Sequence, residues 1–225
     1  MKPALLIRFV RISLGGLILA LAGGCTSLLP KATVQPTFYS LDGARGESGA
    51  TPKAAAGTPS AATGTAPTLV VNPPRAAAGF DSKRIIYTRD AHRMEYFSHS
   101  EWIDTPARML APLIVAALEH SGQFRAVVPT PSAAAGDIKL DTEILRLQQE
   151  FGGGASRVRF TLRAYLVDSV TRRVLAWREF DETVVAASED PYGGVVAANR
   201  AVQNVLMGVR ALGAEAVAEW GVVKR

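Results

Sequence analysis

The second half of the chain alternates apolar and polar side chains over three long segments. Around residues 157–167 every second residue is apolar, which predicts a β-strand with one face in the core and one in water. The inward set is Val158, Phe160, Leu162, Ala164 and Leu166. Residues 137–151 alternate in the same way but change parity at Leu145, which indicates a β-bulge. A third strand carries its apolar side chains at Val174, Ala176, Phe180 and Val184.

Two turns are expected to join these three strands into antiparallel pairs. The glycines at 152–154 supply a permissive first turn, and residues 168–172 form the second. Pairing about Val170 would bring Phe160 opposite Phe180 on the inner face. The outward pairs that this register predicts are Arg159 with Asp181 and Arg163 with Trp177.

Two segments show helical periodicity instead. Residues 104–106 (Asp-Thr-Pro) predict a helix start, because a side-chain oxygen can accept from the free amides of the first turn and proline costs nothing there. Pro112 is expected to kink this helix, and Gly122 to end it in a left-handed conformation. Its apolar stripe is Leu110, Ile114, Ala117 and Leu118.

A longer helix begins at Pro191, and the spacing of its apolar residues predicts that it packs against the sheet. Its stripe is Val195, Ala198, Val202, Val205, Val209, Leu212 and Ala216.

Shorter strand patterns precede these elements. We expect strands within residues 36–42 and at 68–71, and a hairpin formed by 83–88 and 93–97. Residues 43–66 are rich in Ala, Gly, Thr, Pro and Ser without apolar periodicity. Such a segment buries too little apolar surface to offset its chain entropy, so we expect a disordered insertion.

The N-terminal segment has the layout of a secretory signal. Three basic residues and no acid precede an apolar run from Ile12 to Leu21, and small residues then lead to Cys25, the only cysteine. The run is too short for a stable span of hydrocarbon, which takes roughly 20 apolar residues. One alternative is that Cys25 is a free thiol beside an ordinary signal or anchor, which would leave a reactive group in an oxidising compartment.

The residues before Cys25 resemble the lipobox of bacterial lipoproteins, except that Ala22 stands where that family prefers leucine. The resemblance implies that the Cys25 thiol receives a diacylglycerol, that cleavage precedes it, and that the new amine is acylated. No other cofactor is expected. Acyl chains contribute roughly 0.8 kcal/mol per buried CH₂, so two or three anchor a protein stably. Thr26 rather than aspartate follows, which by the same resemblance implies the outer membrane rather than retention at the inner one.

These patterns predict an α+β protein with a single folded domain. We expect a mostly antiparallel or mixed sheet, with two main helices packed on it, after a lipoprotein signal peptide. The expected boundaries are a signal peptide at 1–24, a lipidated tether and first strand at 25–42, the insertion at 43–66 and the domain at 67–222.

The net charge excludes a nucleic-acid footprint. The formal charge is +5, but the three basic residues before Cys25 account for three of these charges and leave +2 on the mature chain. A small net charge with both signs mixed favours solubility and gives no basic patch for DNA or RNA.

No catalytic or metal-binding constellation is visible in the sequence. The three histidines, His92, His99 and His120, have neither metal-ligand spacing nor cysteine partners. The Gly-Glu-Ser-Gly run at 46–49 lies in low-complexity sequence, and the glycines at 152–154 join two strands, so neither is a nucleophile elbow or a phosphate loop. The acids Glu179, Asp181 and Glu182 fit the alternating charge of a solvated strand face.

Three outward arginines on one strand have two interpretations. Arg157, Arg159 and Arg163 could pair with the acids of the next strand, or could form a docking surface for a partner protein or a lipid headgroup. Pairing with the acids is the simpler interpretation. Because three like charges on one strand exceed what local pairing obviously requires, we nevertheless take these residues as the candidate partner-binding site.

Taken together, the chain resembles the ABC-type transport auxiliary lipoprotein family, typified by paraquat-inducible protein C. The matching features are the lipobox at Cys25, the Phe-Tyr-Ser-Leu run at 38–41, Trp102 ahead of the first helix, and three strands before a final helix. The resemblance implies a non-enzymatic outer-membrane lipoprotein on the periplasmic face. Its implied partners are an inner-membrane permease, its ATPase, and a periplasmic lipid carrier of the mammalian-cell-entry type.

Other functions stay open at this point. A structural or assembly lipoprotein of the outer membrane would share the anchor and the lack of chemistry. A periplasmic hydrolase would need a nucleophile and a base that the sequence does not show. The lipid, the direction of transport and a homo-oligomeric state are not determined by these patterns.

Overall fold

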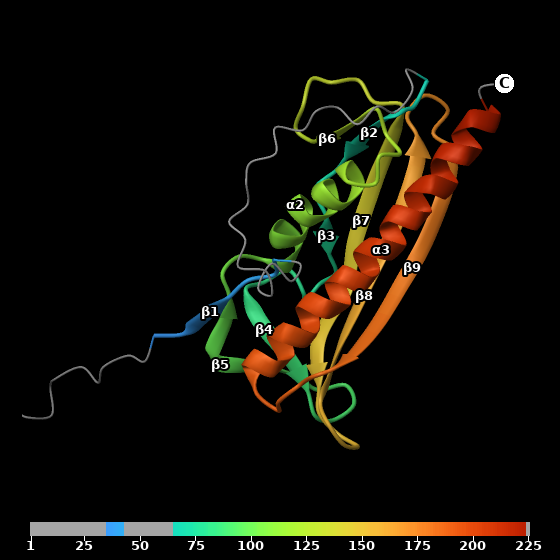
Figure 1. The fold of residues 1–225 in the computed structure, drawn as a ribbon. Helices are drawn as coiled ribbons and strands as arrows, with labels where there is room; N and C mark the ends of the chain where they lie inside the picture. The colour runs from blue at the N-terminus through green and yellow to red at the C-terminus, as the bar shows by residue number, and fades with distance from the viewer. Residues whose placement is uncertain (1–34, 43–64, 224–225) are drawn as a thin grey trace, which may run out of the picture. The chain divides into compact units, whose positions relative to one another are not determined.

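A computed structural model describes residues 35–42 and 65–223, coloured along the chain in Figure 1. Within them lie nine strands and two helices. The strands are β1 (Thr37–Tyr39), β2 (Thr68–Val71), β3 (Arg75–Ala76), β4 (Arg84–Thr88), β5 (Met94–Trp102), β6 (Ala126–Pro129), β7 (Ile138–Glu150), β8 (Arg157–Asp168) and β9 (Val174–Val185). The helices are α2 (Pro106–Glu119) and α3 (Pro191–Val223). The expected signal peptide, Cys25 and nearly all of the expected insertion lie outside the described residues.

The sheet is mixed and is organised around β7. Along one edge β7 pairs antiparallel with β8, and β9 continues the sheet beyond β8. Along the other edge β2, β3 and β4 pair with β7 in succession, each parallel to it. The sheet then extends from β2 to β6, and from β4 through β5 to β1. One long strand therefore holds both the antiparallel and the parallel parts together.

The β-bulge predicted in the first long strand is present in β7. Ile144 pairs with Leu162 and Arg146 pairs with Thr161, so Leu145 is the extra residue between them. Buried positions in β7 accordingly change from even to odd numbers, as the parity of the sequence indicated. The extra residue places Arg146 on the outer face of the sheet.

The predicted register between β8 and β9 is wrong by two residues. Phe180 lies opposite Leu162, not Phe160, and the outward partners are shifted by the same amount. The observed outward pairs are Arg159 with Thr183, Arg163 with Glu179 and Tyr165 with Trp177. Part of the shift lies in the turn, where the Asp168 carboxylate accepts from the amides of Val170 and Thr171. The rest comes from a β-bulge beside the turn, because Leu166 pairs with Ala176 and Val167 with Val174, which leaves Leu175 as an extra residue. Phe180 and Val184 keep their predicted face, whereas Val174, on the turn side of the bulge, is 47% exposed, so its predicted inward position is wrong.

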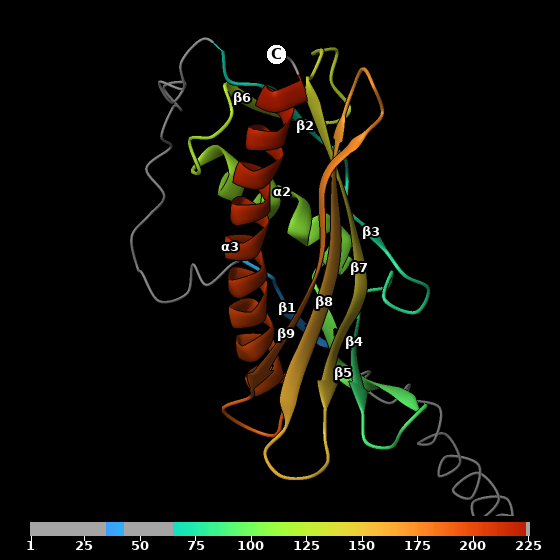
Figure 2. The same cartoon turned by 90° about the vertical axis from the view of Figure 1, so that its right-hand side faces the viewer.

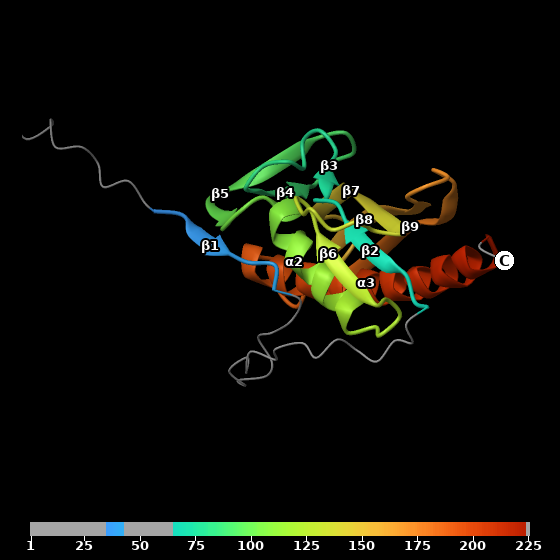
Figure 3. The same ribbon diagram turned by 90° about the horizontal axis from the view of Figure 1, so that it is seen from above.

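Both helices cover one face of the sheet, as Figure 3 shows from above. α3 crosses the inner faces of β8 and β9 along most of their length (Figure 2), and its predicted apolar stripe is buried throughout. Asp190 begins α3, because its carboxylate accepts from the Gly193 amide at 2.7 Å, a contact that also lowers the pKa of Asp190. Gly208 lies against Phe180, where a Cβ atom would come within 2.5 Å of the ring.

The first helix follows the prediction except at its start. Leu110, Ile114 and Leu118 are buried, and Gly122 has a φ of 66° just after the helix. The expected side-chain cap of the first turn is absent, however, because the Asp104 carboxylate accepts from the adjacent Thr105 amide at 2.8 Å. α2 is continuous through Pro112, whose ring lies on the exposed side, and the expected kink stays a prediction.

Three features of the sheet have no clear sequence signal. β5 continues to Trp102, five residues beyond the predicted end of its hairpin, and β3 and β6 are additional short strands. The added part of β5 contains polar residues but pairs with β1 on its far side. From Pro36 onward the elements form one compact unit, and the predicted α+β fold with a mixed sheet and two packed helices is confirmed.

The packing of α3 leads to a stability prediction. Leu212 is fully buried, so Leu212→Ala should lower the free energy of unfolding by about 2–5 kcal/mol, the usual cost of truncating a core leucine. Arg210→Ala, on the exposed side of the same helix, is the control and should change it little. Urea denaturation measures both values. Equal losses of unfolding free energy in the two variants would show that α3 does not pack against the sheet through this stripe.

Candidate functional site

The three candidate arginines lie together on the outer face of the sheet, the face turned away from the helices. Each has a carboxylate on a neighbouring strand. The Arg157 guanidinium is 3.4 Å from Glu150 of β7, Arg159 donates to Asp181 of β9 at 2.9 Å, and Arg163 donates to Glu179 at 2.8 Å. All three occupy odd-numbered positions of β8, which face outward.

The surplus of positive charge that was expected on β8 is absent. Neighbouring acids pair with all three arginines. Ion pairs of this exposure contribute roughly 0–1 kcal/mol each to stability. A role of the three arginines in binding a partner therefore stays a prediction. Such a partner would have to displace the carboxylates that now pair with the arginines.

Asp181 is the most perturbed acid on this face. The hydrogen bond from Arg159 is the largest cause that lowers its pKa, from 3.8 to about 2, and the Thr161 hydroxyl adds a second hydrogen bond at 2.8 Å. Arg146 of β7 acts on the same carboxylate through its charge. Asp181 thus stays ionised at any physiological pH and is unsuited to general acid catalysis.

Arg146 is a residue of this face that the sequence reasoning missed. It lines a shallow groove at one end of the outer face with Arg89, His92, Gln148 and Phe151, and it forms no ion pair within the described residues. The parity change predicted at Leu145 already implied that Arg146 points outward. Only the arginines of β8 were nevertheless taken as candidate site residues.

An aromatic pair lies on the same face, nearer the turn that joins β8 and β9. The rings of Tyr165 and Trp177 stack with their centroids 6.0 Å apart, and Trp177 is 60% exposed. Exposed tryptophan is unusual on a solvated sheet and is common where proteins bind one another. The predicted cross-strand partner of Trp177 was Arg163, which instead pairs with Glu179.

The segment that leads from the expected anchor is fixed to the body of the domain. Asn199 of α3 accepts from the Asp42 amide at 2.9 Å and donates to the Ser40 carbonyl at 3.1 Å. The rings of Tyr39 and Tyr192 lie 6.5 Å apart. β1 is therefore attached at the N-terminal end of α3, by contacts that join residues far apart in sequence.

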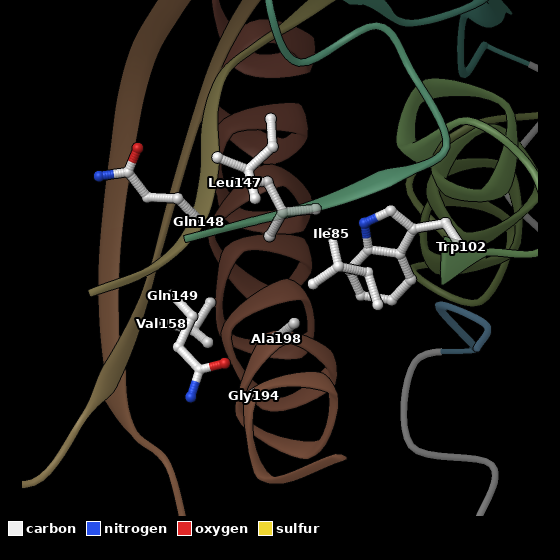
Figure 4. A pocket seen from close by; sticks show the side chains of 9 residues that line it. Ile85, Trp102, Leu147, Gln148, Gln149, Val158, Gly194 and Ala198 are labelled. Carbon is white, nitrogen blue, oxygen red and sulfur yellow. The ribbon is translucent and has the colours of Figure 1, made fainter. Parts of the chain in front are cut away.

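A small cavity lies between the N-terminal part of α3 and the sheet. The cavity in Figure 4 measures about 10 Å³, enough for one water molecule. It is lined by apolar side chains such as Trp102 and Leu147, and by Gln149, whose amide donates to Ser156 at 3.0 Å. Gly194 faces Gln149 so closely that a Cβ atom would lie 2.2 Å from the amide oxygen.

Within the described residues, no group of histidines, cysteines and acids is arranged to hold a metal ion. His120 is at the end of α2, where its ring nitrogen Nδ1 is 2.6 Å from the Ala116 carbonyl. His92 has a left-handed backbone, with a φ of 66°, in the turn between β4 and β5. Neither described helix is both long and apolar enough to cross a membrane.

The ion pair on the outer face leads to a pH prediction. Because the pKa of Asp181 is depressed by Arg159, the stability it contributes should be present above pH 3.8 and lost as the pH falls through about 2. An NMR titration of the Asp181 carboxyl measures this. In Arg159→Gln the midpoint should rise toward 3.8, whereas in the control Arg163→Gln it should stay low. A midpoint unmoved by Arg159→Gln would assign the shift to another cause.

Comparison with solved structures supports the fold. A Xanthomonas campestris protein of the DUF330 family is 26% identical over 65% of this chain and 84% of its own, with a TM-score of 0.60. A second structure, of an uncharacterized protein, is similar in fold with 10% identity, a TM-score of 0.59, and coverage of 79% of this chain and 97% of its own. A comparison with curated proteins gave no match.

A family model described as "ABC-type transport auxiliary lipoprotein component" matches residues 51–208. The match spans most of the chain and includes both the outer face of β8 and the greater part of α3. Its description names a component of a transport system. The chain belongs to the ABC-type transport auxiliary lipoprotein family.

Proposed function

We propose that this protein is an outer-membrane lipoprotein that docks a periplasmic lipid carrier of the mammalian-cell-entry type during lipid traffic between the two membranes. The family match carries this proposal, because it associates the chain with an ABC-type transporter and with a lipid anchor. The inner-membrane permease and its ATPase would supply the energy. The lipoprotein itself would hold the carrier at the outer membrane and catalyse nothing.

The anchor is proposed to be Cys25, with a diacylglycerol on its thiol and an acyl chain on its amine. Between Cys25 and Pro36 lie ten residues, which span at most about 35 Å when fully extended. Because Asn199 then fixes the chain at Ser40 and Asp42, a lipidated Cys25 would hold the N-terminal end of α3 close to the membrane surface. The anchor would thus orient the domain as well as retain it.

The proposed docking surface is the outer face of β8 and β9, with Arg157, Arg159 and Arg163 and the stacked Trp177. Its charges alternate in sign, so a partner with a complementary pattern could replace the present pairs without leaving a charge unpaired. Such contacts are exposed and should weaken as salt shortens the screening length to about 10 Å at 0.1 M.

The anchor is tested by Cys25→Ser. We expect this variant to leave the membrane fraction and to incorporate no radioactive palmitate, since it offers no thiol for the diacylglycerol. Thr26→Ser is the matched control and should remain lipidated. A Cys25→Ser protein that is processed normally and stays with the membrane would refute the lipoprotein anchor.

The docking role is tested by co-purification of the lipid carrier with the full, lipidated chain. We expect capture by the wild type in low salt, a loss of capture as salt increases, and at least a fivefold reduction in Arg157→Glu/Arg159→Glu. Because the new glutamates face Glu150 and Asp181, the melting temperature should fall, but only by a few degrees, and the variant should stay folded at the temperature of the assay. Absence of capture by the wild type would contradict the docking role. Undiminished capture by the double variant would exclude this face only.

A further inference from the structure

Acidic and basic residues of α3 lie on different sides of the helix. The helix contains two acids, Glu215 and Glu219, and both turn toward β9, where they pair with Arg178 at 3.0 Å and with Arg173. These ion pairs join the edge of the helix to the edge strand of the sheet. The side of α3 that faces away from the sheet is consequently left without an acid.

That outward side is unusually apolar. Tyr192, Val196 and Met207 are 63%, 37% and 60% exposed and recur on one side of the helix with Arg200 and Arg210. We call these five residues the outer stripe of α3. A surface helix normally presents charged and polar residues to water on its free face. Large apolar side chains that share the free side of one helix instead favour contact with another molecule.

The two arginines of the stripe differ from those of β8. Neither Arg200 nor Arg210 has a carboxylate partner in the part of the chain that the structure describes, and both are exposed. Ten residues separate them, which corresponds to about 15 Å along the helix. The stripe therefore presents two unpaired guanidinium groups at a fixed spacing, with Met207 between them.

We infer that the outer stripe of α3 docks a partner protein that presents two carboxylates about 15 Å apart beside apolar side chains. The inference rests on the proposed function, in which this chain holds a transport partner, and adds a second contact surface on the layer opposite the β8 arginines. Apolar contacts at Tyr192, Val196 and Met207 supply area, and the arginines supply specificity because they favour acidic partners.

The small residues of the helix make room for such a partner. Ala211, Ala214 and Ala218 are exposed near Arg210. Side chains this short let the backbone of another element approach closely, since the distance between packed helices depends on the side chains at the contact. The C-terminal half of the stripe is thus suited to a helix or strand lying along α3.

Charge argues against the other occupants. A second copy bound through the same stripe would bring arginines against arginines, because the stripe contains no acid. A membrane surface is a poorer fit, since helices that lie in a bilayer interface use larger side chains such as Trp, Phe and Leu and more basic residues. A partner protein with acidic and apolar side chains would complement both the arginines and the apolar residues of the stripe.

The test uses the full, lipidated chain and the lipid carrier. We expect Arg200→Glu/Arg210→Glu to reduce carrier capture at least tenfold at unchanged melting temperature, because repulsion replaces two attractive contacts. The matched control is Lys83→Glu/Arg84→Glu, which makes the same change in net charge at two exposed residues at the start of β4, away from both proposed surfaces, and should capture as the wild type does. Capture by the wild type that survives the stripe variant would overturn the inference while leaving the docking role intact.

Site-specific crosslinking identifies the occupant directly. A photoreactive phenylalanine analogue in place of Met207 should crosslink to the carrier in intact cells, within a segment containing acids and apolar residues, and Arg200→Glu/Arg210→Glu should abolish the product. Crosslinks only to a second copy of this chain, only to lipid, or to nothing would each overturn the inference. Loss of all carrier capture by the wild type would instead refute the proposed function.

Discussion

The packing of α3 against the inner face of β8 and β9 is the interaction on which the rest of the structure depends. The helix covers the strands with a continuous apolar stripe, from Val195 to Ala216, and Gly208 provides the space for Phe180. Ion pairs from Arg173 and Arg178 fasten its edge to β9. Without this helix the longest strands would expose an apolar face to water, and removing that area from water is the main favourable term in folding.

This one-sided core determines where function can lie. The helices use one face of the sheet, so the other face and the outward side of α3 are the large surfaces that remain for partners. The cavity beside Gln149 has room for about one water molecule, so a lipid could not occupy it. The two surfaces are where we propose that the chain, as an auxiliary component of a transport system, binds its partners.

Much of the fold could be predicted because the signals are local. The parity change at Leu145 located the bulge, and the spacing of apolar residues located the buried side of α3. The register of β9 could not be predicted, since it depends on the turn closed by hydrogen bonds to the Asp168 carboxylate and on a β-bulge at Leu175. Nor could the parallel pairing of β2, β3 and β4 with β7, which joins distant segments. At the candidate site, the outward face of the three β8 arginines was predicted correctly. The acid with which each arginine pairs could be assigned only from the observed register, and Arg146 was missed.

The central claim is that this protein acts by binding the lipid carrier through exposed surfaces of an otherwise rigid domain. Hydrogen–deuterium exchange of the lipidated protein, with and without the carrier, tests this most directly. We expect slower exchange confined to the segments that carry the proposed contacts, namely β8, β9, the turn between them and the first two thirds of α3, with β2 and the first half of β7 unchanged. No protection anywhere in the presence of excess carrier, or equal protection of β2 and β7, would contradict the claim.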